Sequence, residues 1–117
     1  MQNKIFESLQ NIIPVATAHG MGKKFVFLNN DDTETALTQF AYGSIAPGEG
    51  CEEHIHPTMD ECFFFLKGSG LYKVGDKEYE LKPESFLRIP AGMPHSLRAM
   101  GNENLEFVYF GLALGEV

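Results

Sequence analysis

The sequence has few cysteines, few basic residues and no long hydrophobic run, and each shortage excludes a class of protein. Two cysteines in 117 residues cannot form a disulfide framework, so we expect reduced thiols in a cytoplasmic protein. Nine basic against sixteen acidic residues give a net charge of −7, which disfavours nucleic acid and membrane surfaces as partners. No stretch approaches the roughly 20 apolar residues of a spanning helix, and MQNKIFESLQ does not resemble a signal peptide.

The remaining composition is that of a globular protein, with 44% apolar and 21% charged residues. A chain of this length normally builds one hydrophobic core. No linker, low-complexity segment or long internal repeat divides it. We therefore predict a single domain, 1–117.

Helical periodicity is confined to the N-terminal segment 1–14. Its apolar residues recur at the i, i+1, i+4, i+7, i+8 spacing of a helix with one apolar face. They are Ile5, Phe6, Leu9, Ile12 and Ile13. Because proline cannot continue a helix, Pro14 ends the pattern, and we predict one short helical segment.

The rest of the sequence alternates short apolar runs with turn residues. The runs span 24–28, 37–46, 62–68, 71–74, 77–82, 85–90, 95–100 and 105–114. Turns such as NNDDTE and GNEN separate them. This spacing is typical of an all-β sandwich or a closed barrel.

Two of these strands are apolar on both faces. Since neighbouring side chains point to opposite faces, Phe63 and Phe65 share one face while Phe64 takes the other. The run LEFVYFGLAL likewise has apolar residues on both faces. One face can line the interior. A second sheet, the N-terminal segment or another subunit must cover the other. We expect a homodimer, but a layered monomer would also satisfy the pattern.

Potential metal ligands follow one another closely in HIHPTMDE. His54 and His56 are two residues apart, so on an extended strand both imidazoles project from one face. Transition metals take nitrogen and oxygen donors at about 2.0–2.2 Å, and PTMD suits a turn that returns a carboxylate to the two rings. Strand parity alone does not decide between Asp60 and Glu61. A further histidine, His95, follows a rigid turn in RIPAGMPHSLR.

The first of these stretches resembles the first motif of the cupin superfamily, a group of small β-barrels. That motif reads G, five residues, H-x-H, three or four residues, E, six residues, G. In this sequence Gly48, His54, His56, Glu61 and Gly68 fill every position at the right interval.

The second stretch is similar to the second cupin motif at its centre. That motif reads G, five residues, P-x-G, two residues, H, three residues, N. Pro90, Gly92 and His95 match it. Its ends differ, because Glu84 stands in place of the glycine and Ala99 in place of the asparagine.

The resemblance covers about residues 40–114 and implies a double-stranded β-helix, a jelly-roll-like barrel that holds one divalent transition metal. The ligands that it implies are His54, His56, Glu61 and His95. It thereby selects Glu61 over Asp60, which we interpret as part of an acidic rim. A shell of nitrogen and oxygen does not distinguish Zn, Ni, Fe, Mn and Cu.

Cupins include dioxygenases, decarboxylases and sugar isomerases or epimerases. The resemblance therefore implies a metalloenzyme for a small metabolite, of the dioxygenase or isomerase type. The alternative is a non-catalytic small-ligand- or sugar-binding cupin in which the metal is structural or anchors the ligand. No clear general base accompanies the ligands, so catalytic residues stay unassigned. With Phe63, Phe65 and Ala99 on the inner face, we expect a mostly apolar cavity and a small-molecule ligand.

Other polar residues near the motifs are better explained by packing or exposure than by a role at the metal. Cys62 has the opposite parity to Glu61, and Cys51 comes just before the histidine strand, from where it could approach the site. The remaining ones are His19 in a loop, Tyr42 and Tyr109 in the core, and Arg88 and Arg98 on the outer face.

Overall fold

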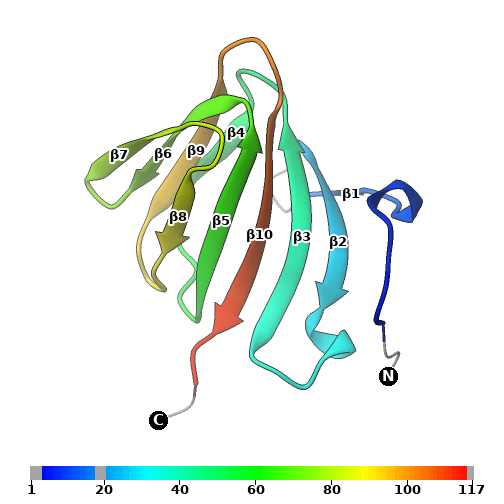
Figure 1. The fold of residues 1–117 in the computed structure, drawn as a ribbon. Coiled ribbons are helices and arrows are strands. Elements are labelled where there is room, and N and C mark those ends of the chain that lie inside the picture. The colour runs from blue at the N-terminus through cyan, green and yellow to red at the C-terminus, as the bar shows by residue number, and fades with distance from the viewer. Residues whose placement is uncertain (1–3, 18–20, 116–117) are drawn as a thin grey trace.

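The computed structural model describes residues 4–17 and 21–115, whose secondary structure is mostly β-strand (Figure 1). Its elements in chain order are η1 (Leu9–Asn11), β1 (Val15–Ala16), β2 (Lys23–Asn29), η2 (Asn30–Asp32), β3 (Leu37–Ile45), β4 (Gly50–His54), β5 (Met59–Lys67), β6 (Ser69–Val74), β7 (Lys77–Leu81), β8 (Phe86–Ile89), β9 (His95–Met100) and β10 (Leu105–Ala113), where η is a 3-10 turn. None of the helices within these ranges has the length and apolar character needed to cross a membrane.

The strands form two antiparallel sheets that face each other. One sheet has the order β1-β2-β3-β10-β5-β8 and the other β4-β9-β6-β7. From β3 onward the chain passes repeatedly from one sheet to the other, as in a jelly roll. The two sheets do not close into a barrel. Side chains fill the space between them, and this holds their edges too far apart for backbone hydrogen bonds.

The core lies between the sheets and follows the predicted alternation. Phe63 and Phe65 are buried, whereas Phe64 between them is 41% exposed. On β9, Leu97 and Ala99 are buried on the same face as His95. The inner faces of β5 and β9 are therefore the ones expected from strand parity.

The turn before β5 is shorter than PTMD. Pro57 and Thr58 form it, and β5 already begins at Met59, so Asp60 and Glu61 lie within the strand. Cys51 belongs to β4, which begins before and ends sooner than the strand expected to carry both His54 and His56.

The predicted helical segment at 1–14 is wrong for the residues that the structure describes. From residue 4 onward only Leu9–Asn11 is helical, as a single 3-10 turn. Ile5 is 94% exposed, Phe6 87% and Ile13 85%, so the apolar residues of the pattern are not packed in this chain. A helix of about ten residues is marginal in water unless its apolar face is buried, which explains the difference.

Candidate metal centre

Three imidazoles converge at one end of the space between the sheets. His54 ends β4 and His95 begins β9, and they are direct partners in the ladder between these strands. His56 follows β4 in the loop. The ring centroids are 4.1 Å apart for His54 and His95, 4.8 Å for His54 and His56, and 5.2 Å for His56 and His95.

The donor atoms of this cluster are close enough to share a metal ion. One ligand atom from each histidine lies within 4.8 Å of the other two. Two nitrogens that each lie about 2.1 Å from one ion are at most about 4.2 Å apart, so binding needs only small side-chain movements.

Backbone carbonyls fix the tautomers of two of these rings. His54 Nδ1 lies 2.8 Å from the carbonyl oxygen of Glu52, and His95 Nδ1 lies 2.9 Å from that of Met93. Because a carbonyl oxygen only accepts, each neutral ring donates through Nδ1 and keeps its lone pair on Nε2. Metal-binding histidines are commonly oriented in this way.

A carboxylate lies against the imidazoles. Glu61 Oε1 is 3.3 Å from His56 Nε2 and 3.7 Å from His95 Nε2. Burial raises the pKa of the Glu61 carboxyl to about 7, against a smaller lowering by the charge of Lys24. Lone pairs of a carboxylate and an imidazole at this separation repel unless a cation or a proton lies between them. The residues therefore fit a divalent metal with three nitrogen donors and one oxygen donor.

The cluster borders a cavity of about 190 Å³ between the two sheets, where His54 and His56 line it. Part of its wall is aromatic, with Phe63, Phe107, Tyr72 and Tyr109. Burial, followed by the charge of Glu61, raises the pKa of Tyr109 to about 12 and that of Tyr72 well above its ordinary value. Both phenols therefore stay protonated at neutral pH and can donate hydrogen bonds to a ligand.

The expectation of a mostly apolar cavity missed several polar residues. Thr17, Lys23 and Lys24 of β2, and Gln39 of β3 also line it. Lys23 is exposed and Lys24 is half-buried, and Lys24 Nζ donates to Gln39 Oε1 at 3.1 Å. The sequence did not reveal Lys24 because the ladder between β2 and β3 shifts register between Val26 and Leu28. Counting alternate residues along KFVFL therefore does not show which of its side chains face the interior.

Asp60 forms a hydrogen bond to the loop that precedes His95. The interpretation of Asp60 as part of an acidic rim is therefore incomplete. Asp60 Oδ1 accepts the backbone N–H of Ala91 at 2.8 Å, while Oδ2 accepts from Arg88 Nη2 at 2.8 Å and Nε at 3.1 Å. The Ala91 bond, and then Arg88, lowers the pKa of Asp60. The register of β5 with β8, which the sequence does not give, brings Asp60 and Arg88 together.

The other polar residues singled out from the sequence have varied environments. Tyr42 points to the outer face and donates to Glu106, away from the histidines. Tyr109 lines the cavity. Cys51 packs against the core and also lines the cavity, and burial, followed by the charge of Glu61, raises the pKa of its thiol. His19 lies outside the described residues.

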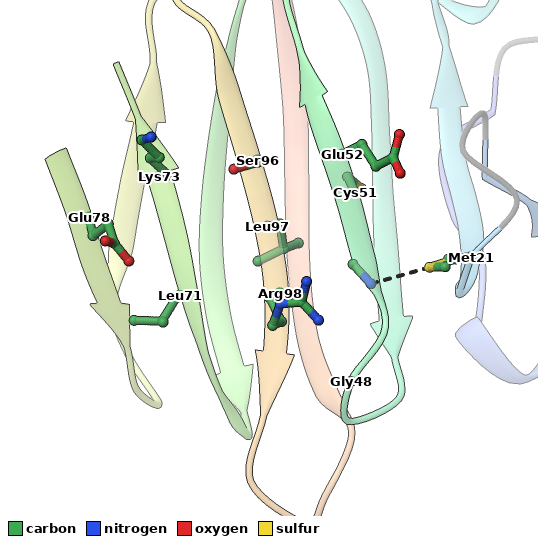
Figure 2. A pocket seen from close by; sticks show the side chains of 11 residues that line it. Met21, Gly48, Cys51, Glu52, Leu71, Lys73, Glu78, Ser96, Leu97 and Arg98 are labelled. Carbon is green, nitrogen blue, oxygen red and sulfur yellow. Dashed lines mark hydrogen bonds between the residues drawn. The ribbon is translucent and has the colours of Figure 1, made fainter. Parts of the chain in front are cut away.

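A second hollow, of about 390 Å³, lies on the outward face of the four-stranded sheet (Figure 2). Lys73, Glu78 and Arg98 project into it from neighbouring strands. The three clustered histidines do not line this hollow, since His95 points to the other side of β9. Cations and carboxylates of similar number border it, and nothing in its donor set suits a transition metal.

Comparison with known proteins adds a family match and distant relatives. The family model described as "Cupin domain" matches residues 41–111. The tetracenomycin polyketide synthase protein TcmJ of Streptomyces glaucescens is 28% identical over 81% of this chain and 64% of its own length. The polyketide synthase CurC of Streptomyces cyaneus is 28% identical over 67% of this chain and 56% of its own. The chain thus spans less than two thirds of either relative.

A solved structure shares the fold over most of the chain. The crystal structure of a predicted oxalate decarboxylase from Thermotoga maritima superimposes with a TM-score of 0.86. The match covers 94% of this chain and all of that one, at 22% sequence identity. At this identity the likeness shows the arrangement of the strands alone.

Proposed function

Because the chain belongs to the cupin domain family, we propose that it binds one divalent transition metal and acts on a small metabolite in the adjoining cavity. The ligands are His54, His56, His95 and Glu61. The observation that carries the proposal is the convergence of three imidazoles and a buried carboxylate beside an aromatic cavity. This donor set suits Fe, Mn, Ni, Zn or Cu.

The reaction that we propose is of the dioxygenase or isomerase type. A bound metal would supply Lewis-acid or redox chemistry at the end of the cavity. The aromatic walls exclude water, and the phenols of Tyr72 and Tyr109 donate to ligand oxygens. Similarity to proteins named for polyketide synthesis supports a small, oxygen-rich substrate. The free thiols of Cys51 and Cys62 agree with a cytoplasmic location, which is part of the proposal.

Metal content tests the first part of this proposal. Protein purified without nickel resin, as isolated or after loading separately with Fe, Mn, Ni, Cu and Zn, should contain one metal per chain by elemental analysis. His95→Ala and Glu61→Gln should weaken binding by roughly a hundredfold or more while the circular dichroism spectrum is kept. Glu53→Gln, which changes an exposed carboxylate on the same strand as His54, is the matched control. Failure of every loading to give stoichiometric metal refutes the proposal.

The second candidate function is a binding protein in which the metal anchors a ligand without turnover. The cavity residues Cys51, Tyr72 and Tyr109 favour it, because burial raises the pKa of each and keeps it protonated at neutral pH, while Glu61 is assigned to the metal. Calorimetry that detects a ligand, with no product formed and no oxygen consumed across a substrate panel, would establish this function. An enzyme should instead lose turnover in Glu61→Gln.

A further inference from the structure

Lys24 points from β2 into the metal cavity. In the ladder between β2 and β3 it is paired with Gly43, and direct partners in a sheet share a face. The face of Gly43 is the inner one, because a Cβ added to this glycine would lie only 2.6 Å from Cε2 of the buried Phe107. Lys24 is accordingly half-buried and lines the cavity.

A chain of hydrogen bonds positions this ammonium group. Asn29 Oδ1 accepts from Gln39 Nε2 at 3.3 Å, and Gln39 Oε1 accepts from Lys24 Nζ at 3.1 Å. An ammonium has three donors, so two others remain for a ligand or for water. Among the described residues no carboxylate lies within 4 Å of Lys24 Nζ, although the whole chain has sixteen acidic residues and nine basic ones.

The electrostatics of the cavity favour an anionic ligand. A divalent metal beside the single carboxylate of Glu61 leaves one excess positive charge, and Lys24 adds a second. A neutral ligand would leave both charges in a half-buried space, where uncompensated charge is costly.

The shape of the cavity favours a small ligand with a flat body. Its volume of about 190 Å³ corresponds to roughly six water molecules at about 30 Å³ each. The rings of Phe63 and Tyr109 on its wall are parallel within 8°, with centroids 5.2 Å apart. Flat conjugated molecules pack well on such rings.

We propose that Lys24, positioned by Gln39, binds the anionic end of the ligand, which is a small flat carboxylate whose other oxygen-bearing end meets the metal. Lys24 is then the residue that selects carboxylates over neutral analogues. This inference rests on the proposed function and narrows its substrate class.

Calorimetry with two matched probes tests the inference. The first probe is 3,4-dihydroxybenzoate, whose catechol end can chelate a metal and whose carboxylate lies at the far end of the ring. The second is 3,4-dihydroxybenzamide, which has the same shape without the charge. Metal-loaded protein should bind the carboxylate at least about tenfold more tightly than the amide, since hydrogen bonds between charged groups are the strong ones.

Substitutions locate the origin of that preference. Lys24→Met should reduce the ratio of the two affinities to about one, while Lys24→Arg should keep most of it. Lys73→Met removes the same charge from the outer face of the other sheet and should leave the ratio unchanged. Circular dichroism and elemental analysis of every variant show whether the fold and the metal are retained.

Each outcome bears on one of the two proposals. Metal-loaded wild type that binds neither probe, or binds both equally, overturns the anion subsite and leaves the metal site intact. Equal loss of preference in Lys24→Met and Lys73→Met also overturns it. If no variant takes up metal, the proposed function fails. If the metal-free protein still prefers 3,4-dihydroxybenzoate over 3,4-dihydroxybenzamide, and Lys24→Met abolishes this preference, the result supports the anion subsite alone.

Discussion

Glu84 occupies a backbone conformation that a glycine would adopt more easily. Ser85 N–H donates to the carbonyl of Lys82 at 3.0 Å, so residues 82–85 form a β-turn with Pro83 second and Glu84 third. The φ of Glu84 is 72°, the single positive φ among the described non-glycine residues. A positive φ at the third position defines a type II turn, for which glycine is preferred. The glycine that the cupin motif has at this position adopts a positive φ without strain, whereas Glu84 adopts it with strain.

Glu84→Gly should stabilise the protein. A side chain in the left-handed region costs about 1–2 kcal/mol, and glycine removes this cost. The greater flexibility of glycine in the unfolded chain offsets roughly half of that benefit, so the free energy of unfolding should rise by about 0.5–1 kcal/mol. We expect a rise of a few degrees in Tm by differential scanning calorimetry. Glu84→Ala is the control, because it removes the same charge and keeps the strain. A Tm for Glu84→Gly no higher than that of Glu84→Ala would contradict the argument.

At the scale of the element, the loop between β8 and β9 leads to His95 and is held by contacts with β5 and with the loop after β4. Asp60 accepts from the backbone of Ala91, and the next residue, Gly92, donates its N–H to the carbonyl of His56 at 2.9 Å. The loop is thereby attached to the segment that carries the other two histidines. In the proposed metal centre, Asp60 would therefore position His95 without being a ligand.

Asp60→Ala should weaken metal binding by about tenfold, as losses of supporting hydrogen bonds commonly do, and should also lower Tm. The pKa of Asp60 is lowered in the folded protein, so its stabilising effect is present above the ordinary aspartate pKa of 3.8 and disappears as pH falls below it. The difference in Tm between wild type and variant should accordingly shrink in acid. Asp76→Ala, in the exposed turn between β6 and β7, is the control for metal titration and melting.

A role for Asp60 confined to the rim predicts equal results for the two variants. Unchanged metal affinity in Asp60→Ala, together with a Tm difference that does not depend on pH, would exclude the positioning role.

The elements show which parts of the structure local sequence determines. Alternation along one strand put Phe63 and Phe65 on the face of Glu61, and Leu97 on that of His95, because this property needs only the strand itself. The resemblance then identified these faces as the inner ones, and the three apolar residues are buried. Pairing between strands is not local, and the inward Lys24 was missed for that reason. The bounds of the histidine strand were misplaced for the same reason, because GCEEH lacks apolar alternation and β4 is defined by its pairing with β9.

The N-terminal pattern failed for a related reason. A spacing of apolar residues says which face would be buried, but the surface that buries it belongs to the rest of the molecule. The motif spacing indicated the proximity of the histidines and Glu61, because one short turn brings Glu61 within 3.3 Å of His56; their role as metal ligands stays a prediction.

At the scale of the whole molecule, the six-stranded sheet has an apolar outer face that the chain leaves partly uncovered. Phe64 of β5 is paired with Phe86 of β8, and they are 41% and 65% exposed. Further along the sheet, the rings of Phe40 and Phe110 meet edge to face with centroids 6.3 Å apart. Contiguous exposed apolar residues such as these, together with those of segment 4–16, are typical of a surface that binds a partner.

We expect a second copy of the chain to cover this face, with its N-terminal segment contributing apolar side chains. A two-fold arrangement would bury both uncovered surfaces at once, since each copy offers the sheet and the segment. Sedimentation velocity at micromolar concentration should then find a dimer. Phe64→Asp and Phe86→Asp should shift it to monomer, because a carboxylate in the centre of an apolar interface is costly to desolvate.

Tyr79→Asp is the matched control for these variants, because Tyr79 is a 41% exposed aromatic residue on β7 of the other sheet. It should leave the dimer intact. The metal centre faces the interior, so the monomeric variants should keep their metal content, which separates loss of assembly from loss of fold. A wild-type chain that sediments as a monomer contradicts the expectation, as would dissociation by Tyr79→Asp to the same extent. Dimers that persist in both phenylalanine variants would place the interface elsewhere, and the apolar outer face would then need a covering from the chain's own N-terminal segment.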